Sequence, residues 1–145
     1  MRKRSKAREL ALQSLYQLEI RKGENIPETV WFPDEADLPV PESRQTGVAN
    51  STRQFAHELI EGVTAKGAEL DRLISEATQH WKLPRMAIVD RLILRLGCYE
   101  ILFCPETPPA VVINEAVELA KRFSTGVSGA FVNGILDYIA RSKVS

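Results

Sequence analysis

Apolar residues recur every three or four positions along most of the chain, which is the spacing of one face of an α-helix. Five segments follow this pattern: residues 5–22, 51–78, 86–103, 109–123 and 129–142. Segment 86–103 is apolar almost all round, as expected of a central, buried helix. The alternation typical of strands is nowhere convincing, so the pattern predicts an all-α fold, a compact helical bundle.

Prolines and acidic residues interrupt this pattern. Pro105 and Pro108 end segment 86–103, and Pro109 suits the first turn of the next helix. Residues 24–43 carry six acids, no Lys or Arg, and four of the eight prolines. Because repeated prolines remove backbone donors and disfavour helical geometry, residues 23–47 are expected to form a long surface loop.

A length of 145 residues suits one domain, 1–145, with an ordinary hydrophobic fraction of 44%. Lys+Arg and Asp+Glu number 19 each, so the formal net charge is zero. No apolar run approaches the ~20 residues that cross a bilayer, so no membrane partner is expected. Two cysteines cannot form a disulfide framework, which favours a reducing, cytoplasmic compartment.

Side chains suited to catalysis or metal binding are scarce. The only histidines are His57 and His80, and the only cysteines are Cys98 and Cys104. The two cysteines lie about 240° apart around one predicted helix, so they cannot share a metal. Phosphate-loop, hydrolase and metalloprotease motifs are absent from the sequence. We therefore predict no catalytic residue, no metal site and no cofactor, and expect that the chain is not an enzyme.

The first predicted helix carries two apolar stripes on a wheel of about 100° per residue. The core stripe contains Ala7, Leu10, Ala11, Leu15 and Leu18. The second stripe lies almost opposite and contains Leu12, Tyr16 and Ile20. A surface helix of a monomer needs only one stripe, so the second indicates a partner-binding face. The alternative, given equal weight, is that the loop 23–47 folds back and covers it.

The same helix begins with five cations and no acid. These residues are Arg2, Lys3, Arg4, Lys6 and Arg8. Concentrated positive charge attracts nucleic-acid phosphates, and a flexible basic arm can wrap a single strand. Gln13 continues the polar side and is placed to read a base edge. The alternative is a frayed basic terminus that aids solubility, as most short Lys/Arg runs do.

Several motifs together resemble the NusB family of bacterial antitermination factors. They occur in the family's order and cover nearly the whole chain apart from residues 23–50 and the last few positions. The motifs are residues 4–16 (RSKARELALQSLY), 69–71, 81–83, 89–96 with Tyr99 and Glu100, 112–121 (VINEAVELAK) and 131–137 (FVNGILD).

The resemblance implies six or seven helices in two packed sub-bundles, about 1–82 and 84–145. It implies binding of boxA-type single-stranded RNA of ribosomal transcripts together with NusE, a small-subunit ribosomal protein. That complex joins other Nus factors on RNA polymerase in the bacterial cytoplasm. The implied RNA contacts are Arg2, Lys3, Arg4, Lys6, Arg8, Gln13 and Phe131. The implied partner-binding residues are Leu12, Tyr16, Glu19 and Ile20.

Two residues of the later motifs are interpreted as structural, and one segment departs from the family. Asn114 and Asn133 are expected to satisfy neighbouring backbone groups inside the bundle. Residues 125–130 (TGVSGA) lack the charged side chains that relatives often carry there, which removes polar RNA contacts on that side.

Two other functions stay open. One is a non-catalytic protein-interaction bundle whose RNA site has decayed. The other is a stand-alone relative of the NusB-like domain of ribosomal-RNA methyltransferases, which is weak because no Rossmann-like domain for the methyl donor follows. Relatives in this family occur as monomers and as dimers, so a homodimer also stays open.

Overall fold

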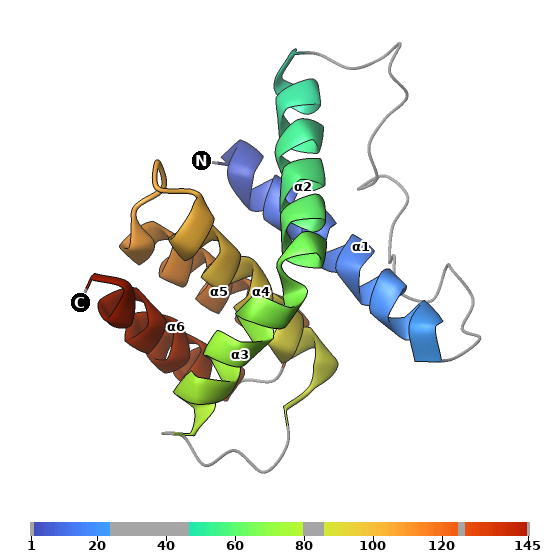
Figure 1. Cartoon of the computed structure of the whole chain (residues 1–145). Coiled ribbons are helices and arrows are strands. Elements are labelled where there is room, and N and C mark those ends of the chain that lie inside the picture. Colours follow the sequence, from blue (N-terminus) through green and yellow to red (C-terminus); the bar gives the residue numbers. More distant parts are fainter. Residues whose placement is uncertain (1, 24–46, 80–85, 125–126, 145) are drawn as a thin grey trace. The chain divides into compact units, whose positions relative to one another are not determined.

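The structure, a computed structural model, describes residues 2–23, 47–79, 86–124 and 127–144, and these residues form helices and no strand (Figure 1). The helices are α1 (Arg2–Gly23), α2 (Gly47–Ala65), α3 (Gly67–Thr78), α4 (Ile88–Phe103), α5 (Pro109–Phe123) and α6 (Ser128–Val144). The predicted all-α bundle is confirmed. The predicted loop 23–47 lies almost wholly outside the described residues. None of the described helices is both long and apolar enough to cross a membrane.

The helix predicted over residues 51–78 is two helices in the structure. The break falls at Lys66, just before Gly67, a residue with low helix propensity. Backbone hydrogen bonds from Lys66 N–H to the Gly62 carbonyl and from Leu70 N–H to the Lys66 carbonyl are both 2.9 Å and flank the break. The apolar spacing continues across it, which is why the periodicity alone predicts one helix.

The chain divides into two compact units, Met1–Glu61 and Gly62–Ser145. The division falls within α2, whereas the expected sub-bundle boundary lies after α3, near residues 82–84. In the structure α3 packs on α4 and α6, so it belongs with the helices that follow it. The last turn of α2 belongs to the second unit as well, because a Cβ atom at Gly62 would overlap the ring of Tyr99 in α4.

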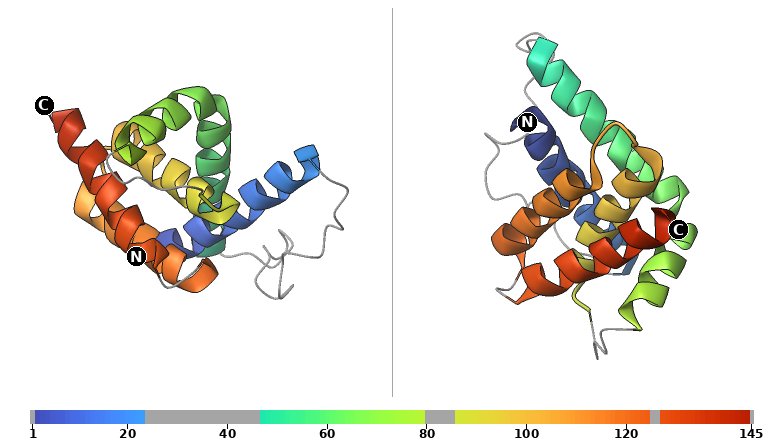
Figure 2. Two further views of the ribbon diagram at one scale, coloured as in Figure 1. Left: turned by 90° about the horizontal axis from the view of Figure 1, so that it is seen from below. Right: turned by 90° about the vertical axis from the view of Figure 1, so that its left-hand side faces the viewer.

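Helix α4 is the centre of the second unit. Its neighbours are α3, α5 and α6, and α6 also packs against α3 and, most extensively, α5 (Figures 1 and 2). The predicted burial of this helix is confirmed. Its buried residues are Asp90, Leu92, Ile93, Leu94, Leu96, Gly97, Cys98, Glu100 and Ile101. Gly97 permits close contact with α6, since a Cβ there would lie 2.6 Å from Cδ1 of Leu136.

A two-pronged ion pair fastens α3 to α4. Arg95 Nε donates to Asp71 Oδ1 and Arg95 Nη2 donates to Asp71 Oδ2, each at 2.7 Å. The side chain of Arg95 is 16% exposed and that of Asp71 45% exposed, so the pair is partly shielded from water. Paired, parallel hydrogen bonds of this kind are stronger and more specific than a single contact.

In the first unit, buried residues of α2 follow the helical period. Phe55, Ala56 and Leu59 are buried, while His57 and Glu58 between them are exposed. This one-sided burial is typical of an amphipathic helix. Helix α1 differs from this, as described below.

Breaking the Arg95 pair should lower stability measurably. Replacing Asp71 by Ala leaves a mostly buried guanidinium without its carboxylate and should reduce the free energy of unfolding by about 1–2 kcal/mol. The matched control is Asp137→Ala, which removes the exposed partner of Arg141 at 2.8 Å and should cost at most about 0.5 kcal/mol. Urea denaturation of the wild type and the two variants measures these losses. An equal loss of unfolding free energy in both variants would show that the Arg95–Asp71 pair contributes no more than an exposed ion pair.

Candidate nucleic-acid interface

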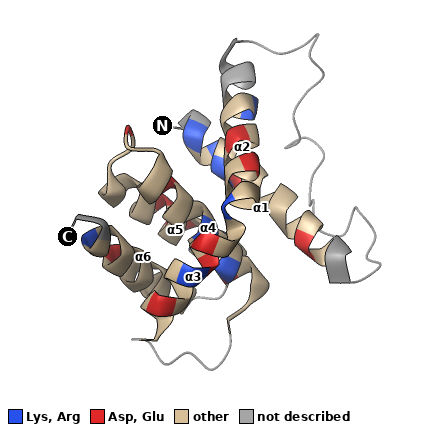
Figure 3. Cartoon of the chain, in the orientation of Figure 1, with Lys and Arg blue, Asp and Glu red and all other residues tan. Residues whose placement is uncertain are grey.

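The predicted basic residues all lie in the first turns of α1, which begins at Arg2. Figure 3 shows Lys and Arg in blue near the start of this helix, after its grey tip. They are therefore part of a helix, not a flexible arm, and that part of the expectation is wrong. A helix spaces its cations at fixed intervals, so Arg4 and Arg8 are one turn apart on the same side. Nothing is described of the Arg2 and Lys3 side chains.

Arg4 and Arg8 share one aromatic neighbour, Phe55 of α2. The guanidinium carbon of Arg4 lies 4.1 Å from the centre of the Phe55 ring, and that of Arg8 lies 5.8 Å from it. Both distances are within the range of cation–π attraction. Phe55 is 9% exposed and Arg8 only 4%, whereas Arg4 is partly exposed. Sequence reasoning missed Phe55, because nothing in the periodicity of α2 separates a ring that holds cations from an ordinary core residue.

The other predicted RNA contacts on α1 have different surroundings. Lys6 is 38% exposed at its side chain and lies 4.0 Å from the Glu9 carboxylate, a distant ion pair. Gln13, expected to read a base edge, is 3% exposed, and its Oε1 has no hydrogen-bond partner among the described residues. Arg8 and Gln13 are thus interior residues of this structure, and direct contact between their side chains and RNA is not available in it.

The two predicted stripes of α1 are only partly right. Leu12, assigned to the outer stripe, has no exposed surface, while Leu18, assigned to the core stripe, is 44% exposed. The wheel assumed one core face, but this helix buries residues all round over residues 7–15. The buried residues of α1 are Ala7, Arg8, Leu10, Ala11, Leu12, Gln13 and Leu15. Tyr16, Glu19 and Ile20 are partly exposed, so the accessible part of the second stripe lies in the later turns.

Phe131 lies in the first turn of α6 and is partly exposed. Its contact with RNA stays a prediction.

Hydroxyl groups bond the start of α6 to its neighbours. Ser128 Oγ donates to Asp90 Oδ2 at 3.0 Å and lies 3.0 Å from Ser124 Oγ. Ser128 therefore ties the start of α6 to α4 and to the end of α5. Of the segment that departs from the family, residues 125 and 126 lie outside the described part, and Val127 is 75% exposed.

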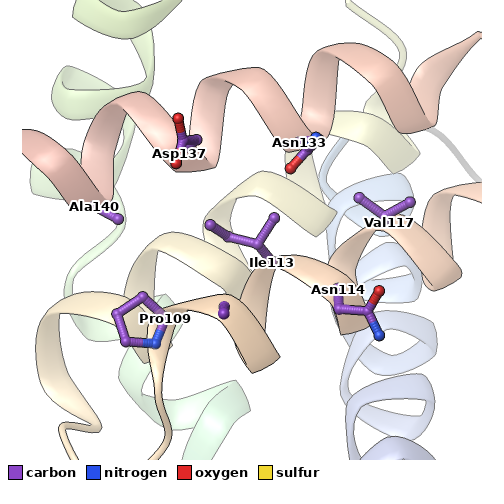
Figure 4. Close-up of a pocket in the computed structure, with 8 residues that line it drawn as sticks. Pro109, Ile113, Asn114, Val117, Asn133, Asp137 and Ala140 are labelled. Carbon is purple, nitrogen blue, oxygen red and sulfur yellow. The ribbon is translucent and has the colours of Figure 1, made fainter.

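Asn114 and Asn133 are not inside the bundle. Both are exposed and line an open groove of about 440 Å³ between α5 and α6 (Figure 4). Ile113 of α5 and Asp137 of α6 line the same groove. The expectation that these amides satisfy interior backbone groups is wrong, because each falls on the solvent side of its helix.

The next residues to consider are the cysteines and the possible metal ligands. Burial, with a smaller contribution from the nearby Glu69 carboxylate, raises the pKa of Cys98 to about 12. Cys98 is thus a buried, protonated thiol, as expected of a small core residue. Within the described ranges, no three of the His, Cys, Asp and Glu side chains are grouped closely enough to hold a metal ion.

Comparison with known proteins decides the family. The NusB family matches residues 5–141 of this chain. The chain belongs to the NusB family. It is 45% identical to the transcription antitermination protein NusB of Desulforapulum autotrophicum over 94% of this chain and 90% of that protein. It is 44% identical to the protein of the same name from Geobacter sulfurreducens, over 92% of this chain and 90% of that protein.

Solved NusB structures share the fold. A structure of T. maritima NusB is 37% identical, with a TM-score of 0.71 over 95% of this chain and 90% of that chain. A structure of the antitermination factors NusB and NusE in complex with dsRNA is 27% identical, with a TM-score of 0.72 over 98% of each chain. The resemblance in the sequence motifs is thereby confirmed.

The two cysteines of this NusB-family chain should differ in reactivity. At pH 8 a thiol with a pKa of about 12 is ionised in roughly one molecule in ten thousand, so Cys98 should resist iodoacetamide. Cys104 is only partly buried and should be alkylated. Mass spectrometry of peptides from native and urea-unfolded protein measures both sites. Equal alkylation of the two cysteines in the native protein would contradict the buried position of Cys98.

Proposed function

We propose that this chain is a transcription antitermination factor that binds RNA together with the ribosomal protein NusE. The proposed RNA is the boxA-type element of ribosomal transcripts, and the complex joins other Nus factors on RNA polymerase in the bacterial cytoplasm. The observation that carries the proposal is the match to the NusB family along residues 5–141, which includes α1 from residue 5 onward and the FVNG motif.

The chemistry of α1 supports an RNA-binding role. Of the cations whose side chains are described, Arg4 and Lys6 are partly exposed, and Arg8 adds its charge from an interior position. We place direct RNA contacts at Arg2, Lys3, Arg4, Lys6 and Phe131. Gln13 is only 3% exposed, so we assign it a role in the interior of the fold and no direct RNA contact.

The later turns of α1 support a protein-binding role. Tyr16, Glu19 and Ile20 are partly exposed, and Leu18 beside them is 44% exposed. An apolar surface that includes a tyrosine is typical of the centre of a protein interface, and a carboxylate suits its polar rim. We place NusE on these residues, with Leu12 supporting the helix from inside.

The proposal includes no catalytic step. The relatives bear the name of a transcription factor, and about nine-tenths of their length is matched by this chain. That leaves too little of either relative for a separate methyltransferase domain, which weighs against the methyltransferase-related alternative.

Salt dependence tests the RNA contact. With about two phosphates contacted by Arg4 and Lys6, the double replacement by Ala should flatten the slope of log affinity against log salt by about 1.4 for single-stranded RNA. Fluorescence anisotropy with labelled boxA-type RNA, single-stranded and as a duplex, measures the slopes and the preferred form. Lys121→Ala with Arg141→Ala, two exposed cations of α5 and α6, is the control and should leave the slope unchanged. An unaltered slope in the α1 variant would remove these residues from the interface.

Replacing two nearby residues of α1, one partly exposed and one fully buried, tests the partner surface. Tyr16→Ala should weaken NusE binding roughly thirtyfold, because loss of an aromatic anchor costs about 2 kcal/mol, and should change the melting temperature little. Leu12→Ala should instead lower stability by about 2–5 kcal/mol, since its side chain is fully buried. Calorimetry of binding and of unfolding measures both. A strongly destabilised Tyr16 variant with unchanged NusE affinity would contradict this assignment.

A further inference from the structure

The guanidinium groups of two arginines in the first unit both lie close to the ring of Phe55. Arg4 approaches to 4.1 Å and Arg8 to 5.8 Å of the same ring centre. The shorter distance is close to van der Waals contact between a guanidinium and a ring. An arginine stacked on an aromatic face is restricted in orientation before any ligand arrives.

The guanidinium of Arg4 is held by this ring. Among the described residues no carboxylate forms an ion pair with Arg4, and its Nη1 is buried with no hydrogen-bond partner. An arginine that is paired with a carboxylate has its charge largely cancelled at close range, whereas one held by an aromatic face keeps it. Within the described part of the chain, Arg4 is therefore a preorganised cation whose charge no carboxylate cancels.

Arg4 also suits an anionic ligand. Its side chain is partly exposed, and its guanidinium presents N–H groups that phosphate oxygens can accept in pairs. A guanidinium already ordered by the Phe55 ring loses less freedom when it binds an RNA phosphate.

We propose that Phe55 is a positioning residue for RNA binding: its ring fixes the Arg4 guanidinium in the orientation that contacts RNA phosphates. This inference deepens the proposed function and rests on it. Phe55 itself does not touch the RNA; it acts through Arg4. The consequence is that RNA affinity depends on the aromatic character of residue 55 and not only on its size.

RNA titrations of the full chain test this dependence. Phe55→Leu keeps an apolar side chain but removes the ring, and should weaken binding of single-stranded boxA-type RNA roughly three- to tenfold. Phe55→Tyr keeps the ring and should bind within about twofold of the wild type. Phe103→Leu is the matched control, because it removes a similar contact, the Lys66 ammonium 5.2 Å from a ring centre, in the second unit. It should leave RNA affinity unchanged.

A double-mutant cycle separates positioning from simple stability. In an Arg4→Gln background, Phe55→Leu should have little further effect on RNA affinity, because the cation that it positions is gone. The salt slope should likewise fall in Phe55→Leu but not again in the double variant. Melting temperatures of all variants show that the titrations are made on folded protein. An equal loss of affinity from Phe55→Leu with and without Arg4 would overturn the proposal.

Side-chain NMR relaxation of the Arg4 Nε–H group tests the positioning without RNA. The group should be rigid in the wild type and in Phe55→Tyr, and mobile in Phe55→Leu. Equal mobility in the wild type and Phe55→Leu would overturn the inference while leaving the RNA-binding function intact. Absence of RNA binding by the wild-type protein would instead overturn the proposed function, and the role of Phe55 in it, whatever the mobility of Arg4.

Discussion

The burial of α4 is the constraint on which the second unit depends. A helix with apolar residues on every side has no stable place at a surface, so other helices must cover it. Helices α3, α5 and α6 do so, and each makes its main contacts with α4 or with another helix of this group. Two polar side chains of this interior are bonded to neighbouring elements: the buried Asp90 carboxylate accepts a hydrogen bond from Ser128 at Oδ2, and Arg95 donates to Asp71.

Much of this arrangement can be predicted from the sequence, because helical periodicity and proline positions are local signals. The limits of α4 and α5 follow from Pro105, Pro108 and Pro109, and α5 begins at Pro109 as expected. The break at Lys66 could not be predicted, because the apolar positions on either side keep one continuous period. A glycine inside a helical pattern lowers helix propensity without requiring a break.

The details of the candidate interface are less predictable, since they depend on residues far apart in the sequence. The cluster of cations in α1 is visible in the chain, and so is the family to which it points. A helical wheel assumes one buried face. It therefore cannot predict that Leu12 and Gln13 are buried or that Leu18 is exposed. The pairing of Arg4 with Phe55 joins two helices separated by a long acidic segment, and no spacing rule connects them.

The hydroxyl contact between Ser124 and Ser128 has a consequence for altering this chain. The two residues stand at the end of α5 and the start of α6, and Ser128 is also bonded to Asp90 of α4. These bonds act on the two helix ends themselves. Substitutions between the two serines should therefore change the charge of this surface while α5 and α6 keep their packing on α4.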